Sequence, residues 1–81
     1  MTLADRAAAA RSDLEETLLA YLSTKPDGAL NSEIARDLGL ESDFDGRQKN
    51  FLTYSLLGGL MARGAIERRE IGNKTPFFLS Q

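Results

Sequence analysis

The end of the chain contains the stretch that decides the fold, residues 61–79, which read MARGAIERREIGNKTPFFL. Apolar residues stand on both sides of a polar run around Gly72, the pattern of two short strands joined by a tight turn. Pro76 has no backbone N–H and is restricted to the start or edge of a strand. Ile66 and Ile71 differ in parity, which indicates either a bulge or an isoleucine that covers the core only from the strand end. The stretch predicts a β-hairpin.

A helix is expected directly before this hairpin, from about Gly46 to Arg63, closed by Gly64. Asp45 and Gln48 form a D-x-x-Q variant of the capping box, which marks its start. At 100° per residue, one side of this helix is mostly aliphatic and is expected to pack on the core. The packing side carries Leu52, Thr53, Leu56, Leu57, Leu60 and Met61, and the opposite side carries Arg47, Gln48, Phe51, Tyr54, Ser55, Gly58 and Ala62.

A shorter helix is expected within residues 30–40, which read LNSEIARDLGL. Asn31 is the expected N-cap, Glu33 lies near the positive end of the helix dipole, and Gly39 follows the last turn. The segment AL just before Asn31 is short enough to pair only weakly as a strand. The segment therefore predicts a compact helix with a start signal at Asn31 and a stop signal at Gly39.

The first helix is expected within residues 3–25, LADRAAAARSDLEETLLAYLSTK, because strong helix formers dominate this stretch. Its start has two candidates. Ser12 begins an S-x-x-E capping box, whereas Thr2 and Asp5 offer a weaker cap ten residues earlier. Residues 1–11 are accordingly either a frayed or an extended N-terminal segment of this helix.

The composition excludes several kinds of site. The chain has 81 residues, which is the size of one domain, and we expect a single domain over residues 1–81. It contains no cysteine and no histidine, so thiolate chemistry, imidazole metal ligands and the commonest general base are absent. We expect no catalytic residue, no metal and no cofactor. Since the sequence has no secretory or membrane-spanning run, a soluble, cytoplasmic protein is expected.

Charge is distributed unevenly along the chain. The formal net charge is −2, but residues 1–45 hold four basic and ten acidic side chains, a balance of −6. Residues 46–81 hold six basic and two acidic side chains, a balance of +4. Such asymmetry between halves is typical of a surface that faces a polyanion. The second half is therefore the candidate nucleic-acid-binding half.

The segments LNSEIARDLGL and LLGGLMARGAIERRE, in this order, resemble the winged helix-turn-helix family over residues 13–81. The resemblance implies a mainly α fold with a small β-hairpin (α+β), in which three helices precede a C-terminal hairpin called the wing. It also implies that the third helix enters the DNA major groove and that the wing contacts the flanking backbone. Residues 39–66 are more faintly similar to winged-helix segments found with restriction enzymes and in small phage or bacterial proteins.

The residues expected to bind double-stranded DNA fall into two groups. The start of the third helix favours phosphate through its free N–H groups, and arginine and glutamine there can contact base edges. Hairpin residues would meet the backbone. The helix group is Arg47, Gln48, Lys49, Asn50, Tyr54 and Ser55, and the wing group is Arg68, Arg69, Gly72, Asn73 and Lys74.

Two alternatives stay open for the aromatic residues Phe51 and Tyr54. They are either core residues of a helix rotated from this estimate, or a contact surface for a second copy or another protein. The expected function is DNA binding without enzymatic activity, in a small transcription regulator or the recognition module of a restriction-modification or mobile-element protein. The alternative is a winged helix that binds proteins or dimerises and does not bind DNA.

Overall fold

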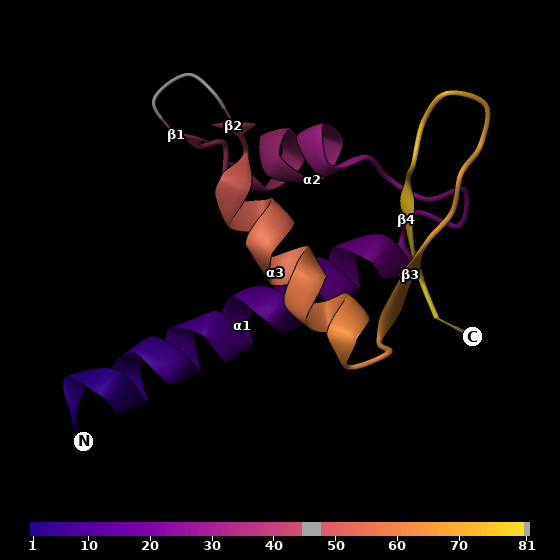
Figure 1. The fold of residues 1–81 in the computed structure, drawn as a ribbon. Coiled ribbons are helices and arrows are strands. Elements are labelled where there is room, and N and C mark those ends of the chain that lie inside the picture. Colours follow the sequence, from indigo (N-terminus) through magenta and orange to yellow (C-terminus); the bar gives the residue numbers. More distant parts are fainter. Residues whose placement is uncertain (45–47, 81) are drawn as a thin grey trace.

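The computed structural model describes residues 1–44 and 48–80. In this part of the chain, three helices are followed by an antiparallel hairpin, and a shorter strand pair precedes the last helix (Figure 1). The expected fold class is confirmed: the protein is mainly helical with a small sheet, in a winged-helix-like layout. The elements are α1 (Leu3–Ser23), α2 (Asn31–Leu38), β1 (Asp43–Phe44), β2 (Gln48–Lys49), α3 (Phe51–Ala62), β3 (Ile66–Arg68) and β4 (Phe77–Leu79).

Helix α1 begins at the earlier of its two candidate caps. The Asp5 amide donates to Thr2 Oγ1 at 3.0 Å, and the Thr2 amide donates to Asp5 Oδ2 at 3.2 Å, which closes a reciprocal capping box. The alanine run is therefore helical, and Ser12 lies inside the helix. Leu18 and Leu22 are buried near the other end of α1.

Helix α2 spans the expected residues but its cap differs. Leu30, not Asn31, occupies the N-cap position, and the Leu30 amide donates to Glu33 Oε1 at 2.9 Å. Asn31 is inside the helix because its side chain bonds to α3 instead: Thr53 Oγ1 donates to Asn31 Oδ1 at 2.6 Å. Gly39 ends the helix in the left-handed region, with φ 69°, as expected.

Helix α3 starts later than the sequence predicted. Gln48 and Lys49 form strand β2, which pairs with β1, and Asp45 and Gly46 lie outside the described residues. Asn50 takes a left-handed backbone conformation, φ 58°, directly before the helix. The predicted start at Gly46 with a cap from Asp45 and Gln48 is therefore wrong.

Ser42 stabilises the actual start of α3 from across the loop. The Asn50 amide donates to the Ser42 carbonyl, and the Ser42 amide donates to Asn50 Oδ1 at 3.3 Å. Ser42 Oγ then accepts a 3.2 Å hydrogen bond from the Leu52 amide, one of the N–H groups that a helix start leaves without an intrahelical partner. A non-local pair thus replaces the local capping box.

The rotation of α3 is close to the expected one. Thr53, Leu56, Leu57 and Leu60 are buried, whereas Met61 is 36% exposed and lies outside the core. On the side expected to be open, Phe51 is 38% exposed and Tyr54 is 44% exposed, so the alternative that placed these two residues in the core is wrong. The helix ends at Ala62, and Gly64 follows with φ 76°, as its stop signal predicted.

The hairpin of residues 66–79, from here on the wing, keeps one register along its length. Ile66 pairs with Leu79, Arg68 with Phe77, and Ile71 with Lys74. This constant register leaves no place for the expected bulge, and Ile71 lies 54% exposed near the tip rather than over the core. Ile66 alone of the two isoleucines joins the core.

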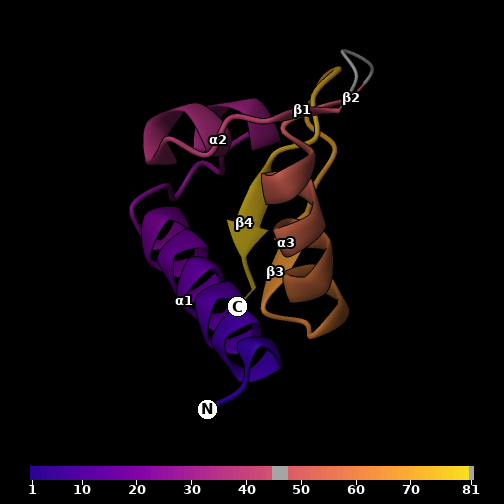
Figure 2. The same ribbon diagram turned by 90° about the vertical axis from the view of Figure 1, so that its left-hand side faces the viewer.

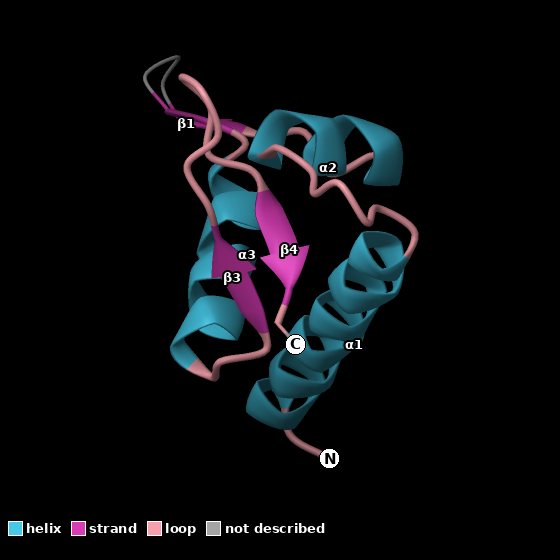
Figure 3. Cartoon of the chain, turned by 90° about the vertical axis from the view of Figure 1, so that its right-hand side faces the viewer, coloured by secondary structure: helices cyan, strands magenta, loops and turns pink. Residues whose placement is uncertain are grey.

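The segment before α2 forms a third, single-bridge strand beside the wing. The Ala29 amide donates to the Phe77 carbonyl at 3.0 Å, and the Phe77 amide donates back at 2.8 Å. The weak pairing expected for the segment AL is confirmed. In Figures 2 and 3 the wing lies between α1 and α3, so its inner face closes the core that the helices form. The buried core residues are Leu18, Leu22, Ala29, Ile34, Leu56, Leu57, Leu60, Ile66 and Phe77.

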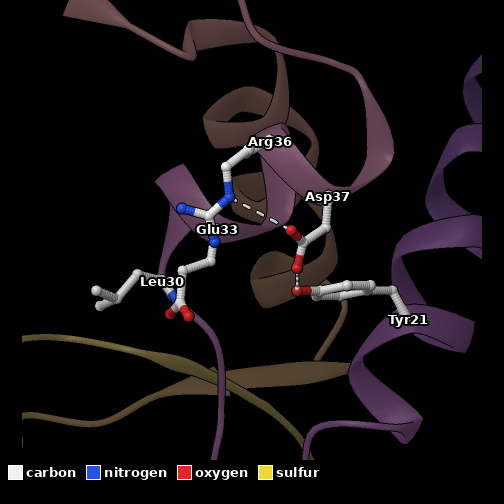
Figure 4. A network of polar contacts seen from close by, with 5 residues as sticks. All are labelled: Tyr21, Leu30, Glu33, Arg36 and Asp37. Carbon is white, nitrogen blue, oxygen red and sulfur yellow. Dashed lines mark hydrogen bonds and ion pairs between the residues drawn. The ribbon is translucent and has the colours of Figure 1, made fainter.

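A polar contact ties α1 to α2 outside this core. The Tyr21 hydroxyl donates to Asp37 Oδ2 at 2.6 Å, and Arg36 Nε lies 3.4 Å from Asp37 Oδ1 (Figure 4). Partial burial and this hydrogen bond raise the pKa of Tyr21 to about 12. The same hydrogen bond, with Arg36, holds the pKa of Asp37 below its ordinary value.

The Tyr21–Asp37 contact should stabilise the protein only within a pH window. Because the pKa of Tyr21 is raised, the contribution of this contact to the free energy of unfolding is complete below pH 10 and disappears as pH rises toward about 12. The lowered Asp37 pKa means that its contribution is lost as pH falls below about 4. Urea denaturation of the parent and Tyr21→Phe should therefore show a difference that is largest near neutral pH. A difference that stays constant at both extremes would contradict the assignment.

Candidate nucleic-acid interface

A groove separates the wing from the starts of α2 and α3, and it has a volume of about 470 Å³. Its floor and walls come from three elements that are distant in sequence, with the wing rising beside the two helices (Figure 1). Five of the residues expected to bind DNA line it together, namely Asn50, Tyr54, Arg68, Asn73 and Lys74. Leu30, Asn31, Ser32, Thr75 and Phe77 complete the lining. We call it the wing groove.

Arg68 supplies a fixed positive charge to the wing groove. Its guanidinium lies 5.3 Å from the centre of the Phe77 ring and 5.9 Å from that of Tyr54, which bridges the wing and α3. Arg68 Nη2 also donates to Thr75 Oγ1 at 3.0 Å. The side chain stays exposed, so its remaining donors face solvent. Two aromatic rings and one hydroxyl thus hold an arginine in place over the groove.

The wing tip adds Lys74 to the same groove. Ile71 and Lys74 exchange backbone hydrogen bonds of 2.8 and 3.1 Å around a two-residue turn. Gly72 is in the left-handed region in this turn, with φ 63°, where a side chain would be strained. Lys74 is exposed, and Asp27 and Glu33 line a smaller pocket of about 210 Å³ on its other side. Lys74 therefore lies between the wing groove and an acidic neighbour.

Amide side chains join the two helix starts at the floor of the groove. Asn31 Nδ2 donates to the Asn50 carbonyl at 3.2 Å, and Thr53 Oγ1 lies 3.0 Å from the same carbonyl oxygen. The Asn50 side-chain oxygen accepts from the Ser42 amide. The Asn50 amide in turn donates to the Ser42 carbonyl, and the Asn50 carbonyl accepts from the Tyr54 amide at 3.1 Å, so the first role of Asn50 is to fix the start of α3.

The structure separates the two neighbouring arginines of the wing. Successive strand residues point to opposite faces, so Arg69 lies away from Arg68. Its guanidinium stacks 4.3 Å from the centre of the Phe78 ring, and Arg69 Nε donates to Glu67 Oε1 at 2.7 Å. Arg69 lines another pocket, of about 310 Å³, together with Lys25. It is therefore not part of the wing groove.

The remaining predicted residues lie near the start of α3 or outside the described residues. Ser55 is exposed on α3 beyond the groove lining, and Gly72 lies at the wing tip. Gln48 and Lys49 belong to β2, directly before Asn50. Arg47 lies outside the described residues. The predicted helix group is thus divided between a strand, a helix cap and the helix itself.

Sequence reasoning missed several residues of the groove. Ser32 stands in the first turn of α2, and Thr75 positions Arg68. A hydroxyl in the first turn of a helix is a recognisable signal, because free N–H groups there already favour an anion. The bond between Asn31 and Thr53 had no such signal, since the two residues are 22 positions apart.

Comparisons with models of protein families, with curated proteins and with solved structures find no match for this chain. Among residues 1–44 and 48–80, no helix is long and apolar enough to cross a membrane. In the same part of the chain, no group of three acidic, histidine or cysteine side chains is placed to hold a metal ion. Function is therefore inferred from the geometry and charge of the wing groove.

Proposed function

We propose that this protein is a winged helix-turn-helix domain that binds double-stranded DNA without catalysing a reaction. In this proposal α3 enters the major groove and the wing contacts the backbone, in a small regulator or the recognition module of a restriction or mobile-element protein. The observation that carries it is the wing groove, where two helix starts, Arg68 and Lys74 converge. Fold alone would not support it, because one fold serves many functions.

Arg68 and Lys74 are the proposed phosphate contacts. Arg68 is fixed by Tyr54 and Phe77, so little side-chain entropy is lost when a phosphate binds. The starts of α2 and α3 add the positive ends of two helix dipoles on the same side. Ser32 brings a hydroxyl donor to this rim. Contacts of this kind fix the position of the duplex and contribute most of the salt-dependent affinity.

Sequence reading is proposed for the residues around the start of α3. Tyr54 and Ser55 lie on its exposed face. Gln48 and Lys49 form strand β2 and directly precede the Asn50 cap, so the chain places them at the same end of the helix. Base edges are reached from such positions when a helix start points into the major groove.

A protein partner is the second candidate, and the composition of α3 favours it. Residues 51–62 contain no charged side chain, although the helix exposes Phe51, Tyr54 and Met61 by 38%, 44% and 36%. The net charge of −2 also opposes phosphate. In this alternative Phe51 and Tyr54 contact another protein or a second copy.

A salt titration with a labelled duplex of mixed sequence tests the DNA proposal. The parent should bind the duplex near 50 mM salt. A log–log plot of its association constant against salt concentration should be linear, with a slope of about −0.9 for each phosphate contact. Arg68→Gln and Lys74→Gln should each reduce the magnitude of this slope by about 1 and weaken binding to all sequences alike. Arg69→Gln is the matched control, because the residue is adjacent but stacks on the opposite face of the wing.

Thermal melts of the three variants separate lost contacts from lost folding. Arg68→Gln should melt close to the parent, since an exposed arginine contributes little to stability. Absence of duplex binding at low salt would overturn the DNA proposal and leave the protein partner. An Arg69→Gln effect equal to that of Arg68→Gln would contradict the wing groove as the binding surface.

A further inference from the structure

Arg68 lies on the inner face of the wing, the face that closes the core. Ile66 and Arg68 are two residues apart on β3 and therefore point to the same side, and Ile66 is only 3% exposed. Across the hairpin Arg68 is paired with Phe77, which is 2% exposed. The inner face of β3 thus leaves the core at Arg68, where the side chain reaches solvent beside the wing groove.

Tyr54 of α3 meets Arg68 at this edge of the core. β3 runs beside α3 (Figure 3), and the carbon of the Arg68 guanidinium lies 5.9 Å from the centre of the Tyr54 ring and 5.3 Å from that of Phe77. Both distances are within the ~6 Å over which an aromatic face attracts a cation. The ring of Tyr54 therefore connects the wing to a helix that has no charged side chain of its own.

Thr75 fixes the direction of the same guanidinium. Arg68 Nη2 donates to Thr75 Oγ1 at 3.0 Å, and Thr75 is half-buried. A contact with a ring face leaves a guanidinium free to turn in its own plane, whereas a hydrogen bond at one nitrogen sets the direction of the others. Because Thr75 uses one N–H of Nη2, the remaining donors stay available to a ligand. Their planar arrangement matches two oxygens of a phosphate.

We propose that Tyr54 is a positioning residue, whose ring orients Arg68 toward a phosphate of the duplex. The inference rests on the proposed function for its ligand, and it assigns Tyr54 a part beyond any contact of its own with the bases. An arginine that is already ordered loses less conformational freedom when the phosphate binds. Since Tyr54 belongs to α3 and Arg68 to β3, the backbone contact of the wing then depends on the helix that is proposed to enter the major groove.

A lysine cannot replace Arg68 in this arrangement. It keeps the positive charge, but its ammonium has neither the planar group that stacks on an aromatic ring nor the fork that matches a phosphate. Arg68→Lys should therefore weaken duplex binding while leaving the slope of the log–log salt plot close to that of the parent. Tyr54→Leu should act in the same way, because Arg68 then keeps its charge but loses its orientation.

The free protein gives a test that needs no DNA. The order parameter of the Arg68 Nε–H group, from NMR relaxation, should be high in the parent, unchanged in Tyr54→Phe and clearly lower in Tyr54→Leu. Tyr54→Phe keeps the ring and removes only the hydroxyl. Arg69 is the internal control, because it stacks on Phe78 on the opposite face of the wing and should be equally ordered in all three proteins. Tyr54 is 44% exposed, so both variants should melt close to the parent.

A salt titration with the mixed-sequence duplex tests the consequence for binding. Tyr54→Leu should weaken binding by about two- to fivefold at every salt concentration, the range expected for loss of a cation–π contact at an exposed site. Tyr54→Phe should bind this duplex like the parent. In an Arg68→Gln background, Tyr54→Leu should have no further effect, because Tyr54 acts through Arg68.

The two measurements separate failure of this inference from failure of the proposed function. An Arg68 order parameter that is unchanged in Tyr54→Leu would overturn the positioning role, whether or not the protein binds DNA. Equal weakening by Tyr54→Leu in the parent and in the Arg68→Gln background would also overturn it, and would show that Tyr54 contacts the duplex itself. A parent that binds no duplex would overturn the proposed function and the ligand named here, while the order parameters would still decide whether Tyr54 orders Arg68.

Discussion

Leu60→Ala is expected to lower the free energy of unfolding by about 2 to 5 kcal/mol. Leu60 is completely buried in the cluster that joins α1, α3 and the wing, together with Leu18 and Leu22. The substitution removes apolar contacts and leaves a cavity that the surrounding helices fill only in part. Domains of this size have about 5 to 15 kcal/mol in total, so a large share of the stability would be lost.

Met61→Ala is the matched control for this prediction. Met61 is the next residue of the same helix and is 36% exposed. Its truncation should cost less than about 1 kcal/mol, since little buried volume is removed. Urea denaturation gives both values. Equal losses for the two variants would show that α3 faces the core with a different side than the structure describes.

Local signals in the sequence were sufficient for most of the fold. Gly39 and Gly64 mark the ends of α2 and α3 because both adopt positive φ values that favour glycine. The wing was predictable from the apolar segments around a Gly-Asn turn. In each case the information lies within a few residues of the feature it predicts.

The start of α3 was not predictable in this way. Asp45 and Gln48 have the spacing of a capping box, yet the helix begins only after Asn50. The cap that forms instead depends on Ser42, which bonds to the Asn50 side chain and to the Leu52 amide. These hydrogen bonds form only because the folded chain brings Ser42 beside Asn50. A local capping signal does not contain this information, and here the non-local hydrogen bonds set the start of the helix.

The candidate site shows the same division. Five of the residues predicted to bind DNA line the wing groove together. The predicted hairpin and the order of the helices had already placed these residues on one side of the protein. The separation of Arg68 from Arg69 follows from strand alternation and was available from the sequence once β3 was located. The Asn31–Thr53 bond connects α2 to α3 and has no sequence signal.

The second large effect is expected from Gly28→Ala, in the turn between α1 and α2. Gly28 has φ 83°, and a Cβ atom there would lie 2.6, 2.8 and 2.9 Å from three carbons of the Phe78 ring. That ring is only 7% exposed, with Arg69 stacked 4.3 Å from its centre, so it has little room to move. Backbone strain of about 1 to 2 kcal/mol adds to an overpacking cost of about 1 to 3 kcal/mol.

Gly39→Ala separates these two contributions. Gly39 has φ 69°, but a Cβ atom there would meet nothing within 4 Å, so only the backbone term of about 1 to 2 kcal/mol applies. Gly28→Ala should therefore be the more destabilising of the two in urea denaturation. It should also weaken duplex binding, because Ala29 holds β4 through Phe77 and a displaced turn moves the wing. Equal losses of stability would mean that the turn at Gly28 does not pack on the Phe78 ring.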